Sequence, residues 1–157
     1  EYHESFRRFM QSIEQHDYVI TVISDSYFKS RNCMYEVLEV VKDSRFSDKL
    51  VFIVLNDEDC QYYKTPKTNS IAANVYSTEG QTSYSIFWKH QETELQKQID
   101  ELGDPTYAIT QIKEKKIIQK ILLDLPEFIE FVRDSKGLSL TEHIARNFSD
   151  IIQFMNL

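Results

Sequence analysis

The fold is decided by the stretch DYVITVISDSYFKSRNCMYEVLEV, residues 17–40. Its first part, residues 18–24, is apolar and β-branched on both faces, which is typical of a strand buried on both sides in a parallel sheet. Ser30 then stands where the N-cap of a helix is expected. A second apolar run, LVFIVLN at residues 50–56, predicts another buried strand. Strand, helix and strand at this spacing predict a βαβ unit with a right-handed crossover.

Further helices are predicted on both sides of this unit. Apolar residues at helical spacing predict an amphipathic helix over residues 5–15. After the second strand, residues 57–83 are polar and rich in turn residues, so they predict a long loop, with a short strand at 71–76 as an option inside it. A helix is predicted over residues 85–102, and the Gly-Asp-Pro sequence that follows ends it.

The last third of the chain reads as helical throughout. Residues 107–135 predict one or two helices, with Pro126 marking either the break or the first turn of the second helix. Ser139 and Glu142 have the spacing of a capping box, which predicts the start of a short helix. A final helical stretch is predicted over residues 148–155.

Composition and charge exclude several classes of function. The chain has 157 residues, a length that suits one domain, and its net charge of −7 argues against a partner that is a nucleic acid. The run KEKK at 113–116 fits a solvated helix face. Two cysteines, Cys33 and Cys60, make no disulfide framework, and four scattered histidines predict no metal site. Cysteines without a disulfide framework favour reduced thiols and a cytoplasmic location. No apolar run is long enough to span a membrane.

Glu36 is the carboxylate that the predicted helix brings closest to the end of the first strand. Ser24, Asp25 and Ser26 lie at the carboxyl end of that strand, where open parallel sheets bind ligands. On a helical wheel Glu36 falls on the flank of the apolar face, and Glu39 falls further round toward solvent. A carboxylate there suits cleavage of an N-glycosidic bond with a cationic leaving group, because it stabilises the developing cation without a second acid. The simpler interpretation is a partner of the helix dipole.

Residues 17–40 resemble the central part of a TIR (Toll/interleukin-1 receptor) domain. The resemblance lies in a hydrophobic strand ending in serine, a polar-aromatic turn, and the pattern S-x-x-C-x-x-E opening a helix, here Ser30, Cys33 and Glu36. The later runs KLVFIVLND and FWKHQETELQKQIDEL are also similar to bacterial members, so the resemblance covers about residues 5–102.

The resemblance implies a fold and a division of the chain. The fold class is α/β, a flavodoxin-like parallel sheet flanked by helices, and the N-terminal strands of that sheet are expected to precede Glu1. Residues 1–125 are expected to form the TIR domain. Residues 126–157 are expected to form a C-terminal helical extension packed on the same domain.

The resemblance also implies an activity, the cleavage of NAD+ into nicotinamide and ADP-ribose or a cyclic isomer of it. Glu36 is the expected catalytic residue, which binds the ribose and stabilises the oxocarbenium-like state. NAD+ enters as the substrate, and no cofactor is expected. The residues expected to contact the substrate are Ser24, Asp25, Ser26, Asn32 and Tyr35. Other TIR domains are the expected partners, in a homo-oligomer that forms on activation in anti-phage defence.

Two alternatives to the enzyme stay open at this stage. One is a non-catalytic TIR scaffold or adaptor that mediates self-association. The other is a protein outside the TIR family that binds a nucleotide or transfers a nucleoside.

Overall fold

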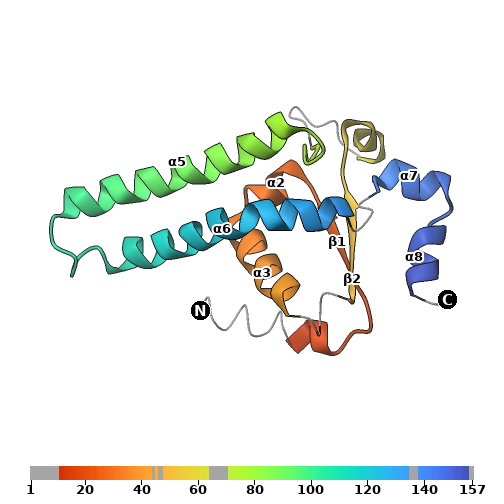
Figure 1. Cartoon of the computed structure of the whole chain (residues 1–157), viewed down its shortest axis with the longest axis horizontal. Helices are drawn as coiled ribbons and strands as arrows, with labels where there is room; N and C mark the ends of the chain where they lie inside the picture. Colours follow the sequence, from red (N-terminus) through yellow and green to blue (C-terminus); the bar gives the residue numbers. More distant parts are fainter. Residues whose placement is uncertain (1–10, 44, 46–47, 64–70, 135–137, 156–157) are drawn as a thin grey trace.

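The computed structural model describes residues 11–43, 45, 48–63, 71–134 and 138–155 (Figure 1). The predicted N-terminal helix lies outside the described residues up to residue 10, and its remainder is helical over residues 11–14. The described elements follow in the order β1 (Val19–Ile23), α2 (Asp25–Phe28), α3 (Arg31–Lys42), β2 (Leu50–Val54), η1 (Asp57–Tyr62), α5 (Thr78–Leu102), α6 (Ile109–Asp134), α7 (Leu140–Ala145) and α8 (Ser149–Phe154).

β1 and β2 pair in parallel and confirm the predicted strand–helix–strand unit. The register runs from Val19 opposite Leu50 to Ile23 opposite Val54. The described part of the chain is therefore an α/β structure, mainly helical, with a two-stranded parallel sheet.

The prediction that β1 is buried on both faces is wrong for the described residues. Ile23 is fully buried and belongs to the hydrophobic core, which also contains residues of α3 and α6. Ile20 and Val22 point to the opposite face and are 47% and 50% exposed. Since successive side chains of a strand alternate between faces, the described helices cover only one of the two faces of β1.

Residues 71–75 extend the carboxyl end of the sheet without forming a strand. The N–H of Asp25 donates to the carbonyl of Ile71 at 3.0 Å, and the N–H of Ala73 donates to that of Leu55 at 2.8 Å. The segment thus bonds to the residues that follow both strands. Isolated bonds of this kind do not make a ladder, so the optional strand at 71–76 is wrong.

The region predicted as a long loop contains two helical segments. Residues 57–62 form η1, and α5 already begins at Thr78. Ser77 caps α5, since its hydroxyl accepts the N–H of Gly80 at 3.0 Å. This cap stabilises the first turn of α5, although the composition of the stretch is typical of turns.

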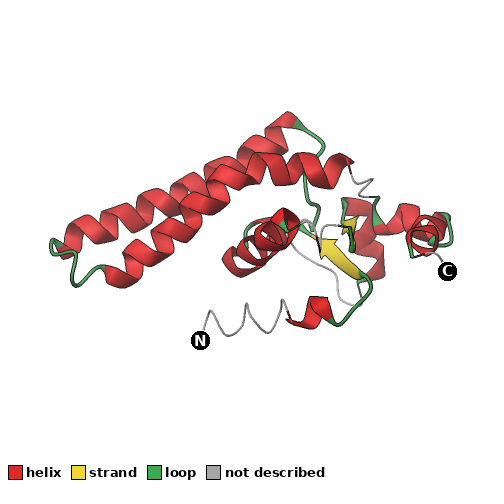
Figure 2. Ribbon diagram, turned by 60° about the horizontal axis from the view of Figure 1, so that its bottom comes forward, coloured by secondary structure: helices red, strands yellow, loops and turns green. Residues whose placement is uncertain are grey.

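α5 and α6 form a long antiparallel hairpin that lies beside the sheet and α3 (Figures 1 and 2). α6 continues through Pro126 to Asp134, so the predicted break or helix start at this proline is wrong. The helix persists because Leu125, Phe128 and Val132 are buried on its core-facing side. The predicted boundary between residues 125 and 126 falls inside this helix.

Aromatic side chains dominate the core between the hairpin and the sheet. Phe28 of α2 stacks on Tyr84 of α5 with 4.6 Å between ring centroids, and it also contacts Phe128 of α6. Trp88 of α5 donates its indole N–H to the carbonyl of Phe28 at 2.9 Å. These contacts fix the short helix α2, and with it the turn that follows β1.

The C-terminal helices form as predicted. Ser139 and Glu142 make the reciprocal capping box that begins α7. α8 covers most of the predicted last helical stretch, and Phe154 packs edge-on against Tyr18 beside β1.

Candidate functional site

Two serine caps shape the chain between β1 and α3. Ser24 caps α2 by accepting the N–H of Tyr27 at 3.1 Å, and Ser30 caps α3 by accepting the N–H of Cys33 at 3.4 Å. The predicted cap at Ser30 is thereby confirmed. α2 is a single turn, and the phenol of Tyr27 lies near enough to Cys33 and Glu36 of α3 for their charges to act on it.

Glu36, Tyr27 and Cys33 form a half-buried group, called here the Glu36 cluster. Burial raises the pKa of the Glu36 carboxyl above its usual range. Burial is also the main cause of the raised pKa of the Tyr27 phenol, and the nearby Cys33 and Glu36 raise it further. Both groups are therefore held in surroundings that disfavour negative charge.

Tyr27 was not among the residues predicted for the site. It lies within the polar-aromatic turn of the decisive stretch, so the sequence did contain a signal. The pattern did not separate Tyr27 from Phe28, and only the folded α2 shows that Phe28 enters the core and Tyr27 meets α3.

Asp25 makes side-chain contacts within α2 and with α5. Its carboxylate pairs with Lys29 at 2.8 Å and accepts the hydroxyl of Tyr84 at 3.2 Å. The same Tyr84 oxygen accepts the N–H of Asn74 at 3.1 Å. Ser26, also predicted for the site, is exposed at the surface of α2.

Tyr35 and Asn32 are not brought into the Glu36 cluster. The ammonium of Lys120 on α6 lies 5.3 Å from the ring centroid of Tyr35, which places this ring on the α6 side of α3. Asn32 is exposed, and its side-chain oxygen accepts a bond from Arg31 at 2.8 Å.

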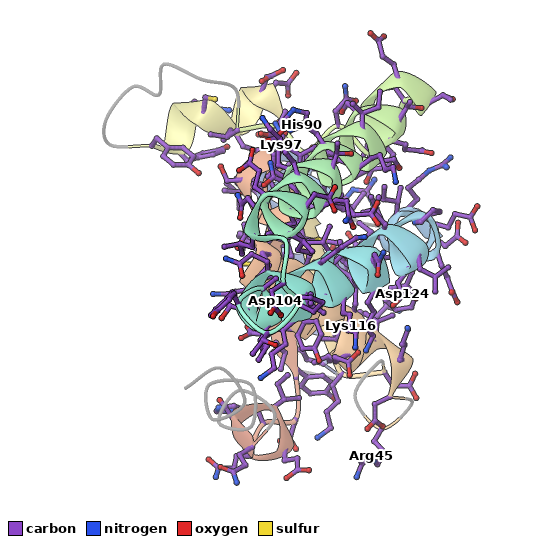
Figure 3. The ribbon with its side chains drawn as sticks, turned by 90° about the vertical axis from the view of Figure 1, so that its left-hand side faces the viewer. Arg45, His90, Lys97, Asp104, Lys116 and Asp124 are labelled. Atoms are coloured by element: carbon purple, nitrogen blue, oxygen red, sulfur yellow. The ribbon has the colours of Figure 1, made fainter. Side chains whose placement is uncertain are left out.

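The α6 side of α3 is built from ion pairs. Lys42 pairs with Asp124 at 2.5 Å, and Figure 3 shows Asp124 on α6. The other pairs along this contact are Arg31 with Glu114 and Glu39 with Lys120. Glu39, which the helical wheel placed toward solvent, thus has a structural partner on α6, about one turn along the helix from Glu36.

Described residues line a cavity of about 800 Å³ at the carboxyl end of β2. Its walls come from the end of β2, η1, the end of α6, α7 and α8, and include Asn56, Tyr76, Arg133, Glu142, Arg146 and Asp150. A smaller cavity of about 270 Å³ lies where α5 and α6 meet the start of α3. Glu36 lines neither of the two.

The described residues contain no group of three or more histidine, cysteine, aspartate or glutamate side chains that could hold a metal ion. None of the described helices combines the length and the apolar character that crossing a membrane requires.

Comparisons of the chain with protein-family models, with curated proteins and with solved structures find no match. The function is therefore inferred from the residues and their geometry.

Proposed function

We propose that the chain is a TIR domain of bacterial type that cleaves the bond between nicotinamide and ribose in NAD+, with Glu36 as the catalytic carboxylate. The observation that carries the proposal is the setting of Glu36, half-buried on a flank of α3 beside the turn that follows β1. The same proposal includes a flavodoxin-like sheet, of which β1 and β2 would be neighbouring parallel strands.

The chemistry follows from the charges that develop in the reaction. The nicotinamide ring of NAD+ is cationic and leaves as a neutral molecule, so it needs no general acid. Positive charge then moves to the ribose, where a carboxylate in a poorly solvated position stabilises it strongly. The raised pKa of Glu36 supports this role, because its negative charge lacks good solvation until a cation forms beside it.

The remaining parts of the proposal concern products and context. Attack by water gives ADP-ribose, and attack by another group of the same substrate gives a cyclic isomer. Ser24, Asp25 and Ser26 follow β1 directly and are the proposed contacts to NAD+, while Asn32 and Tyr35 lie at other positions around α3. We place the activity in a cytoplasmic homo-oligomer that acts in anti-phage defence.

The alternative function is a non-catalytic TIR scaffold that associates with other TIR domains. It is favoured by the exposed face of β1, where Ile20 and Val22 present apolar side chains to solvent. It is also consistent with the absence of Glu36 from the walls of the two cavities described above.

One experiment separates the two functions. The protein is incubated with NAD+ at high concentration with a crowding agent, and nicotinamide release is followed by chromatography. Glu36→Gln should reduce release at least about 100-fold, as expected for loss of a group that stabilises charge in the transition state. Glu39→Gln is the matched control on the same helix and should retain activity.

Two outcomes would contradict the proposed enzyme activity. Release by Glu36→Gln at the wild-type rate would exclude Glu36 as the catalytic residue. No release by an assembled wild-type protein, shown to be oligomeric by light scattering, would leave the scaffold as the function.

A further inference from the structure

α7 contains a buried histidine without hydrogen-bond partners. His143 is only 2% exposed, and neither ring nitrogen has a partner among the described residues. Its ring lies parallel to that of Phe148, with 6.2 Å between centroids and 2° between planes. A neutral imidazole tolerates this position at some cost, whereas an imidazolium, with two N–H donors and a full charge, is strongly disfavoured there.

The charged groups around His143 do not offset its burial. Asp150 of α8 and Glu142 of α7 favour the protonated ring, and Arg146 opposes it. Burial is the largest effect, so the pKa of His143 lies below the usual histidine value. From η1, the carboxylate of Asp59 faces α7, but it already accepts bonds from Thr141 and from a backbone N–H of its own segment.

The connection between α7 and α8 is strained. Asn147 and Phe148 have φ angles of 53° and 55°, the left-handed region that residues other than glycine rarely adopt. Two such residues in succession persist only while the packing around them holds. The stack of Phe148 on His143 is part of that packing.

The two helices also form one wall of the cavity at the carboxyl end of β2. Glu142 of α7, Arg146 directly after that helix and Asp150 of α8 line it together with Val54 and Asn56. Movement of these helices would therefore expose the end of the sheet.

The geometry points to a pH-dependent wall of the cavity: protonation of His143 releases α7 from η1 and opens the cavity at the end of β2. The released form binds a proton that the docked form excludes. Below about pH 6.5, the population of the released form should therefore rise about tenfold for each pH unit while the docked form stays neutral. Above that pH both forms carry a neutral imidazole, so the population of the released form should not depend on pH.

Hydrogen exchange at Thr141 tests this proposal directly. The N–H of Thr141 donates to the buried Asp59 at 2.8 Å, so its protection reports whether α7 is docked on η1. Exchange is measured between pH 7.5 and 5 and corrected for the intrinsic pH dependence of the amide. In the wild type, protection should fall as the pH drops below about 6.5, by up to about tenfold per unit for as long as the docked imidazole stays neutral. His143→Phe keeps a stacking ring without a titrating group, and its protection should stay constant.

His90→Gln is the matched control, because His90 is exposed on α5 and its replacement should leave the acid response of Thr141 unchanged. Loss of Thr141 protection in acid to the same extent in His143→Phe as in the wild type would overturn the proposal. A titration of the wild-type imidazole by NMR gives a second test that needs no variant. A pKa of His143 at or above 6.5 would overturn the proposal as well. Neither test involves NAD+, so both are independent of the proposed enzyme.

Discussion

Asp59 in η1 joins two distant parts of the chain by accepting both the N–H and the hydroxyl of Thr141 in α7. The two bonds measure 2.8 and 2.6 Å and reach the same carboxylate oxygen. The other oxygen accepts the N–H of Asn56 at 2.9 Å. The carboxylate is fully buried, and three hydrogen-bond donors compensate for its removal from water.

Replacement of Asp59 should therefore destabilise the protein clearly. Asp59→Ala leaves partly buried N–H and hydroxyl donors without an acceptor, and it should lower the free energy of unfolding by about 2–4 kcal/mol. Glu58→Ala is the control, since Glu58 is an exposed neighbour in η1, and its effect should stay within about 0.5 kcal/mol. Urea unfolding measures both values, and equal effects of the two variants would contradict this role of Asp59.

Glu36→Gln should stabilise the protein at neutral pH. An acid whose pKa is higher in the folded protein than in the unfolded chain opposes folding while it is ionised. This penalty is present at pH 7 and disappears as the pH falls through the raised pKa toward the unfolded value of 4.5. Because Glu36 is partly exposed, the gain at pH 7 should stay below about 1 kcal/mol, and it should vanish at lower pH.

Glu39→Gln, on the same helix, should have the opposite effect on stability. Glu39 pairs with Lys120 of α6, so its loss should reduce stability at pH 7 by up to about 1 kcal/mol. Thermal unfolding at several pH values measures both variants. If Glu36→Gln unfolds at a lower temperature than the wild type at pH 7, the folded protein stabilises the charge of Glu36, and the prediction is contradicted.

The sequence predicted those features of the fold that depend on neighbouring residues. The two strands, the caps at Ser30 and Ser139, and the end of α5 after Leu102 follow from local composition and hydrogen bonding. The first turns of α5 were missed because their serine, threonine and glycine residues are typical of turns. Their structure depends on a contact with the loop just before them, which is itself bonded to Asp25 and Leu55 at the ends of the two strands. The same holds for Pro126, which burial of the residues around it keeps inside α6.

The site was predicted only in part for a related reason. The position of Glu36 on the flank of α3 follows from helical geometry alone. The contact of Tyr35 with Lys120 depends on how α6 lies against α3, and no local pattern gives this alignment. The nearness of Tyr27 depends on α2 ending after one turn, which contacts with α5 determine.

Gly80 should tolerate no side chain, because α5 meets the preceding loop there. A Cβ atom at this position would lie 2.0 Å from the backbone oxygen of Asn74. Gly80→Ala should therefore cost about 1–3 kcal/mol of stability. Gly103→Ala is the matched control at the other end of α5: φ is 69° there and no atom lies within 4 Å of the added carbon. Its cost should be about 1 kcal/mol, from backbone strain alone. Denaturant unfolding measures the loss of stability in both variants. A smaller loss for Gly80→Ala than for Gly103→Ala would contradict the close approach of the loop.

Pro126→Ala should stabilise the protein, because proline within α6 removes one backbone hydrogen bond and crowds the preceding turn. Pro126 is exposed, so alanine there costs no core packing. It also supplies the missing N–H for the carbonyl of Leu122, and the expected gain is about 1–3 kcal/mol. Glu127→Ala, a change at the next exposed position of the same helix, should alter stability by no more than about 0.5 kcal/mol. Urea unfolding gives both values. A loss of stability in Pro126→Ala would mean that the helix geometry imposed by proline is needed to bring Phe128 into the core.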